Sequence, residues 1–573
     1  MIALLLSMGW AAEVATPSGP LSGGGVHGSE SARLRFWGVP RTLPGVDGIG
    51  FESCPSSWFA PGYCDGDPTH VLDYQELVNR FSINATGARW NLALQGDAVA
   101  LFSNRYILDG ELQHERDLYQ DGVATIFPDA LIVLEKASLE YRGDAFSLTL
   151  GDTWSSFGRG MALNLVKNTD VDLDTSLRGL RVGYSSSNWE LTALSAFTNP
   201  QQVTLENPNE NLAVDDGHAI HAIRAQRYGL GPATVASHLV LVQYNPTPGE
   251  AFAAWNQPVG ALVGGGSVGL TGAAYELYLE SDGYAYNNPA IPVSGGAAVY
   301  ASGSAYLGAT SLLLEAKYSK NTEYINAPTG GYGYEIAAGP TMEYERVITE
   351  DSSATVNSND LIGAKLRADF GVPLPAGNLA PFVSAAVFRD SDLAGLHFNR
   401  SPETVIHPIA GFILVNGGFD AQLRAGYRAD LRDPIDGVSQ GADRMGHADG
   451  EVTVPVVGPL SLSLSVSAMT FGWGKNYPQQ QDFFESANAL AVHVGQPLAV
   501  IFYGEYSNNP LVNSTGNLDD DLYGAVELQW KPKSATTIKA FYGAYRAGIH
   551  CAGGQCRYLP GFEGAKFSID TTF

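Results

Sequence analysis

The sequence has no run of about 18 consecutive apolar residues, so an ordinary membrane-spanning helix is excluded. Charge is also scarce, at 16% of the 573 residues. Basic residues are the rarer kind, with 33 Lys and Arg against 59 Asp and Glu, and the net charge is −26. A surface of that sign repels nucleic acid. We therefore expect no nucleic-acid partner.

The chain has only four cysteines. Cys54 and Cys64 are separated by nine residues, and Cys551 and Cys556 by four. Neither spacing is the CxxC of zinc or thioredoxin sites. Two local pairs in Gly- and Pro-rich loops predict the disulfides Cys54–Cys64 and Cys551–Cys556, which persist only in an oxidising compartment. Two pairs of free thiols in a cytosolic protein are the alternative.

The first 15 residues, MIALLLSMGWAAEVA, agree with export. A short apolar core at residues 2–6, followed by small residues around Trp10, predicts a secretory signal peptide over 1–15, although no basic residue precedes the core. A disordered start is the alternative. Residues 16–30 are rich in Gly, Ser and Pro and predict a flexible segment. The folded domain is expected over 31–573.

Two-residue alternation, by contrast, is abundant. In PLSLSLSVSAM, apolar residues from Leu460 to Val466 alternate with serines. In GAKFSIDTTF, which ends the chain, Phe567 and Ile569 alternate with Lys566 and Asp570. This period predicts strands with two unlike faces. Soluble β-sandwiches share the pattern, so alternation alone does not decide the fold class.

The connections between these strands alternate in length. Tight, Gly- or Pro-rich turns at 141–145, 185–189 and 306–311 are interleaved with long polar connections, such as 104–130 and 199–218. Short turns on one side and long loops on the other are typical of outer-membrane barrels. We therefore predict an all-β protein, a single large antiparallel transmembrane β-barrel with an even number of strands. The best estimate is 26, within a range of 20–26, and the first strand is expected near 33–40.

Two short stretches resemble known families. The terminal Phe573, after alternating residues, resembles the C-terminal signature of Gram-negative outer-membrane proteins. This resemblance implies a bacterial outer-membrane location, membrane lipid as a partner and the barrel-assembly machinery as the reader of Phe573. The stretch LGDTWSSFGRGMALNLVKNTDVDLDTSLRGLRVGY, residues 150–184, resembles the strand–loop–strand of porin-like channels and of large uncharacterised outer-membrane barrels.

The connector 155–176 within that stretch is the candidate site. It contains apolar residues, among them Met161 and Leu165, that a fully exposed loop would hardly need, so we predict that it folds inward as a constriction. Charged residues at a constriction set ion or solute selectivity. The candidates are Arg159, Lys167, Asp170, Asp172, Asp174, Arg178 and, on the lumen side of the next strand, Arg181. An outward loop packed on its neighbours is the alternative.

Catalytic, cofactor and metal motifs are poor. The one GxSxG match, at 265–269, lies in a Gly-rich tract of a β chain, whereas a nucleophile elbow needs strand–turn–helix. His218 and His221 would face opposite sides of a strand. The spaced carboxylates Asp170, Asp172 and Asp174 depart from the EF-hand pattern, because Thr175 replaces its sixth-position glycine. We therefore expect that the protein is not an enzyme and that it has no cofactor and no metal site.

Two functions remain. The first is a channel for hydrophilic solutes or ions, which needs an unblocked lumen. The alternative is a structural sheath or export conduit that encloses a partner protein or polymer, so a protein partner in the lumen or periplasm stays open. The expected width of the barrel favours the conduit, because strand side chains cannot fill so wide a lumen.

Overall fold

A computed structural model describes residues 25–37, 74–103, 125–127, 130–169, 172–202, 217–244, 259–287, 293–326, 336–341, 360–390, 403–432, 442–472, 482–508, 521–545, 548–552, 555–559 and 562–573. The predicted signal peptide, Asp170, Cys54 and Cys64 lie outside these residues. Within them, no helix is long and apolar enough to cross a membrane.

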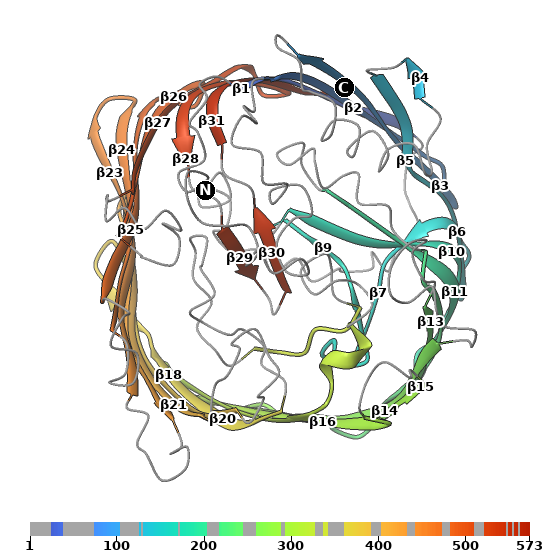
Figure 1. Ribbon diagram of the computed structural model, residues 1–573. Coiled ribbons are helices and arrows are strands. Elements are labelled where there is room, and N and C mark those ends of the chain that lie inside the picture. The colour runs from blue at the N-terminus through green and yellow to red at the C-terminus, as the bar shows by residue number, and fades with distance from the viewer. Residues whose placement is uncertain are drawn as a thin grey trace, which may run out of the picture.

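The chain forms one closed antiparallel barrel of 24 strands (Figure 1). Its wall consists of β1 (Gly25–Trp37), β2 (Tyr74–Thr86), β3 (Trp90–Ser103), β5 (Ala130–Arg142), β6 (Phe146–Thr153), β10 (Leu173–Ser185), β11 (Trp189–Gln202), β12 (Ala219–Leu230), β13 (Ala233–Tyr244), β14 (Val259–Thr271), β15 (Tyr275–Asn287), β16 (Gly295–Leu307), β17 (Thr310–Lys320), β18 (Leu361–Phe370) with its continuation β19 (Val372–Leu374), β20 (Gly377–Asp390), β21 (Glu403–Asn416), β22 (Phe419–Arg432), β23 (Ala442–Val457), β24 (Leu460–Gly472), β25 (Phe483–Val494), β26 (Leu498–Ser507), β27 (Asp521–Lys533), β28 (Thr536–Tyr545) and β31 (Phe562–Thr572).

Shorter elements supplement the wall. They are β4 (Thr125–Phe127), β7 (Ser155–Phe157), β8 (Leu163–Leu165), β9 (Lys167–Asn168), β29 (Gly548–Ala552), β30 (Gln555–Leu559) and the 3-10 turn η4 (Glu323–Ile325). β7 pairs with β8, and β29 pairs with β30, each as a separate small sheet.

The ring closes where β1 pairs with β31, from Ser29 opposite Thr572 to Trp37 opposite Gly564. The predicted fold class, even parity and range of 20–26 are confirmed, and the best estimate of 26 is two strands too high. The difference is one hairpin. The Gly-rich tract at 264–266 lies within a strand, in the middle of β14.

The wall begins earlier than the expected boundary at residue 31. Gly25 is already paired with Thr86, and the ladder runs without a break to Phe36 opposite Gln75. Backbone hydrogen bonds hold this segment, and they do not depend on side chains. The prediction of a flexible segment therefore does not hold for residues 25–30, because Gly and Ser weaken a strand but do not forbid it.

The outer and inner faces of the wall are opposite in chemistry to those of a soluble protein. On β27, Leu528 is 43% exposed, whereas the neighbouring Glu527 is 1% exposed. The same alternation recurs on β24, where Leu464 is exposed and Ser463 and Ser467 are buried. An outer apolar band around a polar interior is the surface that lipid requires of a transmembrane barrel. Lipid also requires that the backbone N–H and C=O groups be hydrogen-bonded within the barrel. Closure of the ring meets this requirement, because every wall strand is paired on both sides.

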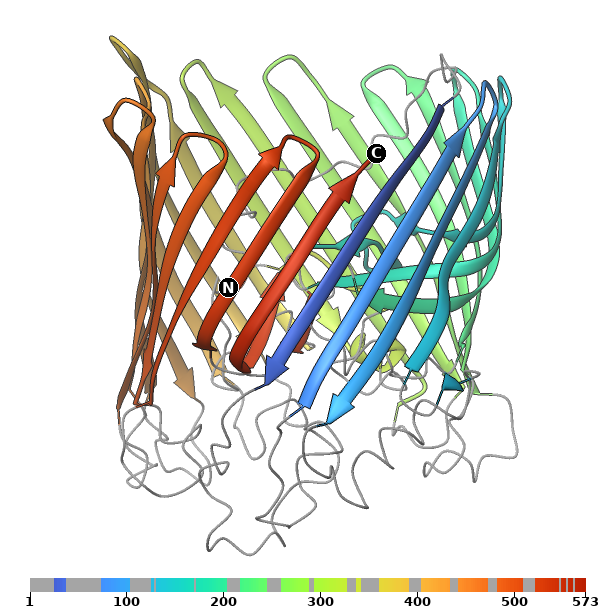
Figure 2. The same cartoon turned by 90° about the horizontal axis from the view of Figure 1, so that it is seen from above.

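The two rims differ as the connection lengths predict. Tight turns gather at the upper rim in Figure 2, and the strand ends that precede and follow the long connections lie at the opposite rim. The turn between β12 and β13 contains only Gly231 and Pro232, and Gly231 has a φ of 68°, which favours glycine. Phe573 lies at the tight-turn rim, next to Gly28.

Candidate functional site: an inner layer on the lumen wall

A second layer of chain lies inside the barrel against β10–β16. It consists of residues 155–169, 322–326 and 336–340, called here the inner layer. Figure 1 shows β7 and β9 within the ring of strands. Buried apolar side chains of the inner layer and of the wall form one cluster, whose members include Phe157, Ala162, Leu163, Leu165, Ile325 and Ile336 from the inner layer and Ile220, Val240, Val242, Val263 and Tyr284 from the wall.

Glycines give the inner layer its shape. Gly158 and Gly160 have φ values of 58° and 88°, in the left-handed region that side chains disfavour. They lie in the turn between β7 and β8, where Ser155 is the register partner of Leu165. A Cβ on Gly158 would lie 2.0 Å from Glu280 Oε1 on the wall. Only glycine allows this close approach.

Hydrogen bonds join the pieces of the inner layer to each other and to the wall. The Arg159 N–H donates to Glu280 Oε2 at 2.7 Å, and the Tyr284 hydroxyl donates to the Met161 carbonyl at 2.7 Å. The Asn164 N–H donates to the Ile336 carbonyl at 2.8 Å. These bonds fix the register between the layers, which apolar packing alone would leave free to slide.

Asp174 is a structural residue at the base of the inner layer. It is 1% exposed and forms an ion pair with Lys136 of β5. Trp154 Nε1 donates a hydrogen bond of 2.6 Å to Oδ1 of Asp174, the oxygen that Lys136 does not contact. A register shift where β3 pairs with β5 lets both Glu135 and Lys136 be buried. Asp174 is therefore not one of a run of solvated charges.

The other predicted site residues take several positions. Arg159 and Lys167 are exposed on the inner layer. Asp172 is buried. Arg178 pairs with Asp152 at 3.1 Å and donates to the Glu135 carbonyl at 2.6 Å. Arg181 alternates with the exposed Leu180 and Val182, so it belongs to the inner face. A role in a constriction stays a prediction for all of them.

The remaining sequence predictions divide in the same way. Cys551 and Cys556 are register partners in the β29–β30 hairpin, and their disulfide stays a prediction, as does that of Cys54 and Cys64. His218 is buried and His221 is exposed, which confirms opposite faces. The expectation of no enzymatic activity stays a prediction. So does the reading of Phe573 by the assembly machinery.

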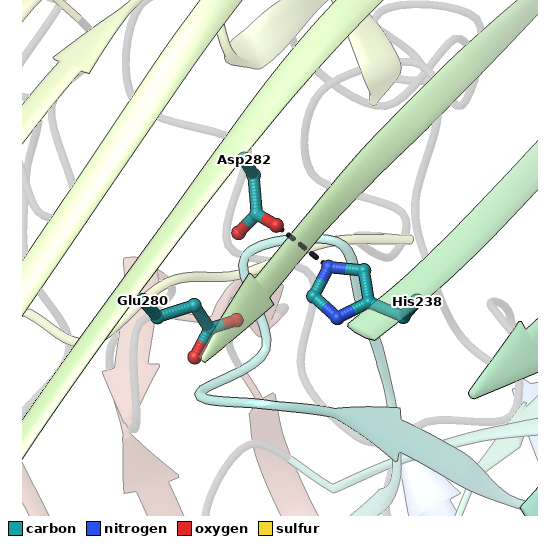
Figure 3. Close-up of side chains that lie close together, drawn as sticks. All are labelled: His238, Glu280 and Asp282. Carbon is teal, nitrogen blue, oxygen red and sulfur yellow. Dashed lines mark hydrogen bonds and ion pairs between the residues drawn. The ribbon is translucent and has the colours of Figure 1, made fainter. Parts of the chain in front are cut away.

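The structure also brings together a cluster that sequence reasoning missed. His238 on β13 and Glu280 and Asp282 on β15 are buried, and their side chains converge beneath the inner layer (Figure 3). His238 Nε2 lies 2.6 Å from Asp282 Oδ1. Tyr278 donates a short hydrogen bond to Glu280. The signal was available, since Glu280 and Asp282 are two apart and so share one face of a strand.

Comparison with known proteins adds little detail. A family model described as a family of unknown function (DUF6029) matches residues 492–573. No curated protein matches the chain. Among solved structures, the siderophore receptor PirA from Pseudomonas aeruginosa has a TM-score of 0.45 at 10% identity, and 96% of this chain covers 80% of that one.

Two further solved structures are similar at the same level. The copper transporter OprC has a TM-score of 0.43 at 9% identity, covering 96% of this chain and 80% of that chain. The translocation pore of the P pilus usher PapC has a TM-score of 0.37 at 9% identity, covering 96% and 99%. The class of protein is thus defined by the residues of this chain: a large antiparallel β-barrel with an apolar outer face and an inner face that carries buried charged side chains beside apolar clusters.

Proposed function

We propose that the protein is a channel for hydrophilic solutes or ions in the outer membrane of a Gram-negative bacterium, narrowed on one side by the inner layer. The observation that carries the proposal is the docking of that layer on the inner face of the wall. It packs against β10–β16. The inner face of β22 and β23 carries ion pairs, among them Arg424–Asp449 and Arg428–Asp430. A barrel of this strand number is too wide for its wall side chains to fill.

Selectivity would arise from charge along the remaining path. Arg159 and Lys167 are the exposed cations of the inner layer. Acidic residues outnumber basic ones by 59 to 33 in the whole chain. A low-dielectric wall focuses the field of such charges on a passing ion. The channel is therefore expected to favour cations, with the two basic side chains opposing that preference locally.

Removal of the β7–β8 hairpin tests the proposal. Residues 156–164 would be replaced by a Gly-Gly linker, which joins the register partners Ser155 and Leu165. In planar lipid bilayers, the purified full-length protein should conduct, and the deletion should raise its single-channel conductance. An equally long replacement at 433–441, between β22 and β23, is the matched control and should raise the conductance less.

The sheath or conduit is the second candidate, and barrel width favours it. The two candidates differ in what the empty barrel does. If intact protein and hairpin deletion both insert into bilayers and neither conducts, the channel proposal fails. A conduit that needs its cargo to open would then be the better account.

A further inference from the structure

We propose that His238, Glu280 and Asp282 bind a divalent transition-metal cation, of which Zn²⁺ is the representative, on the lumen wall beneath the inner layer. One ligand atom from each residue lies within 4.8 Å of the other two. The proposal goes beyond the channel function. Metal binding depends on the docked inner layer, but it does not depend on whether the barrel conducts ions.

The backbone register builds this cluster across three neighbouring strands. His238 of β13 is the partner of Gly265 on β14, and Gly265 is the partner of Asp282 on β15. A Cβ at Gly265 would lie 1.9 Å from Asp282 Oδ1. The missing side chain on the middle strand lets the outer two residues meet over it. Glycine at this position therefore serves the cluster and not a turn.

Each of the two carboxylates, Glu280 and Asp282, has one oxygen that accepts no hydrogen bond from the described residues. Glu280 Oε2 accepts the hydrogen bonds from both Arg159 and Tyr278. Among the described residues, Glu280 Oε1 and Asp282 Oδ2 have no hydrogen-bond partner, although both atoms are buried. A buried anionic oxygen without a donor is costly. A cation placed between these two oxygens removes that cost.

The donor set selects the kind of cation. Ca²⁺ and Mg²⁺ prefer sites made of oxygen alone. One imidazole with two carboxylates suits zinc and neighbouring transition metals, and two carboxylates balance a charge of +2. His238 Nε2 and Asp282 Oδ1, now 2.6 Å apart, would separate to about 3.3 Å around a tetrahedral ion with bonds of about 2.0 Å. Rotation of the Asp282 carboxylate toward Oδ2 provides that change.

The ion would also strengthen the attachment of the inner layer. Glu280 would hold the metal through Oε1 while Oε2 keeps the Arg159 N–H. Gly158 lies directly over Oε1, so the bound ion would be enclosed between wall and inner layer. Since an ion that binds only the folded state stabilises it, zinc should raise the melting temperature of the barrel.

Zinc binding to full-length protein tests the site. The protein, purified in detergent without a histidine tag and stripped with a chelator, would be equilibrated with Zn²⁺ and analysed by elemental mass spectrometry and calorimetry. We expect about one high-affinity ion per chain. His238→Gln, Glu280→Gln and Asp282→Asn should each weaken it more than about 100-fold, because loss of a group that merely orients a ligand already costs 10–100-fold. Excess Mg²⁺ should not compete.

A second pair of histidines provides the matched control. His407 and His447 are both buried, with their Nε2 atoms 2.8 Å apart. His447→Gln should leave the high-affinity ion in place. If it removes the ion, or if Asp282→Asn binds zinc as well as the wild type, the assignment is wrong.

A spectroscopic measurement needs no variant. Co²⁺ added to the stripped wild-type protein should give visible absorption bands of a low-symmetry site with a histidine nitrogen ligand, and Zn²⁺ should displace it. A folded wild-type barrel, identified by its heat-dependent migration on gels, that binds neither ion would overturn the proposal. That result would leave the channel proposal standing, because conductance is measured separately.

Discussion

Gly28 and Phe573 exchange two backbone hydrogen bonds, each 2.8 Å long, at the seam that closes the barrel. The Phe573 ring covers Gly28 so closely that a Cβ there would lie 2.2 Å from it. An aromatic ring over a strand glycine shields a backbone that lacks its own side chain. The last residue is therefore part of the wall.

Gly28→Ala should destabilise the seam. The added methyl meets the end of the ring, so the ring must move off Gly28 and no longer covers the strand backbone there. The midpoint of heat-induced conversion from folded to unfolded migration on gels should fall. Gly28→Ala combined with Phe573→Ala should recover part of the loss, since the ring is gone. Equal midpoints for Gly28→Ala and wild type would show that the ring has room elsewhere.

Lys136→Met should be strongly destabilising. It leaves Asp174 buried without its cation, and breaking a buried pair costs about 3–5 kcal/mol. Urea unfolding of detergent-solubilised protein measures the loss. The double variant Lys136→Met/Asp174→Leu should regain most of it, because neither charge is then stranded. Arg89→Met is the control: its pair with Asp144 is 3.3 Å long and well exposed, so the change should stay within about 1 kcal/mol. A similar loss in both single variants would contradict the assignment of a buried pair.

Gly158→Ala should loosen the inner layer. The new methyl would meet Glu280, and alanine at a φ of 58° is strained by about 1–3 kcal/mol. Hydrogen exchange over residues 155–165 should accelerate. Gly269→Ala is the matched control, because nothing lies within 4 Å of a Cβ there. Protection of 155–165 that is unchanged in Gly158→Ala would mean that the layer is held without this close approach.

Lys167→Gln and Arg159→Gln should increase the cation preference of the channel. Each removes a positive charge that is exposed on the inner layer. Reversal potentials in salt gradients measure the preference, and the effect should shrink as ionic strength rises and the screening length falls. Arg89→Gln, at the turn between β2 and β3, should change it less. An effect independent of salt would argue against a direct electrostatic role.

The Cys551–Cys556 disulfide should be present in protein isolated from cells. Register partners in an antiparallel ladder have Cα atoms about 4.5 or 5.5 Å apart, within the range of about 4.4–6.8 Å that disulfides use. Mass spectrometry of a non-reducing digest should find Cys551 linked to Cys556, and it examines Cys54 and Cys64 in the same run. Maleimide labelling of these thiols without prior reduction would contradict the prediction.

Local pattern predicted the wall well and the lumen poorly. Alternation in β24 and β31 is a property of single strands, so their faces could be read directly. The partner of a charge is a property of the register between strands. Asp174 was a candidate charge of the constriction, and only the pairing that brings Lys136 to it shows a buried ion pair. Long-range register is not encoded in the spacing of either residue.

Glycines have two different causes in this barrel. Gly231 and Gly308 lie in tight turns with positive φ, as Gly-rich turn signals predict. Gly265 lies inside a strand, where a side chain would meet Asp282 on the neighbouring strand. The cluster with His238 could not be read from the sequence, because its members lie on β13 and β15. They meet only through the register of both strands with β14.

The inner layer also bears on the order of assembly. Its pieces flank the strands that they cover: residues 155–169 precede β10–β16, and residues 322–326 and 336–340 follow them. The seam, by contrast, joins Ser29 to Thr572. Because the entropic cost of closing a loop grows with its length, contacts between nearby parts of the chain form first. This side of the barrel can thus become a two-layered sheet while the ring is still open. The inner layer is then in place before β1 and β31 pair and enclose the lumen.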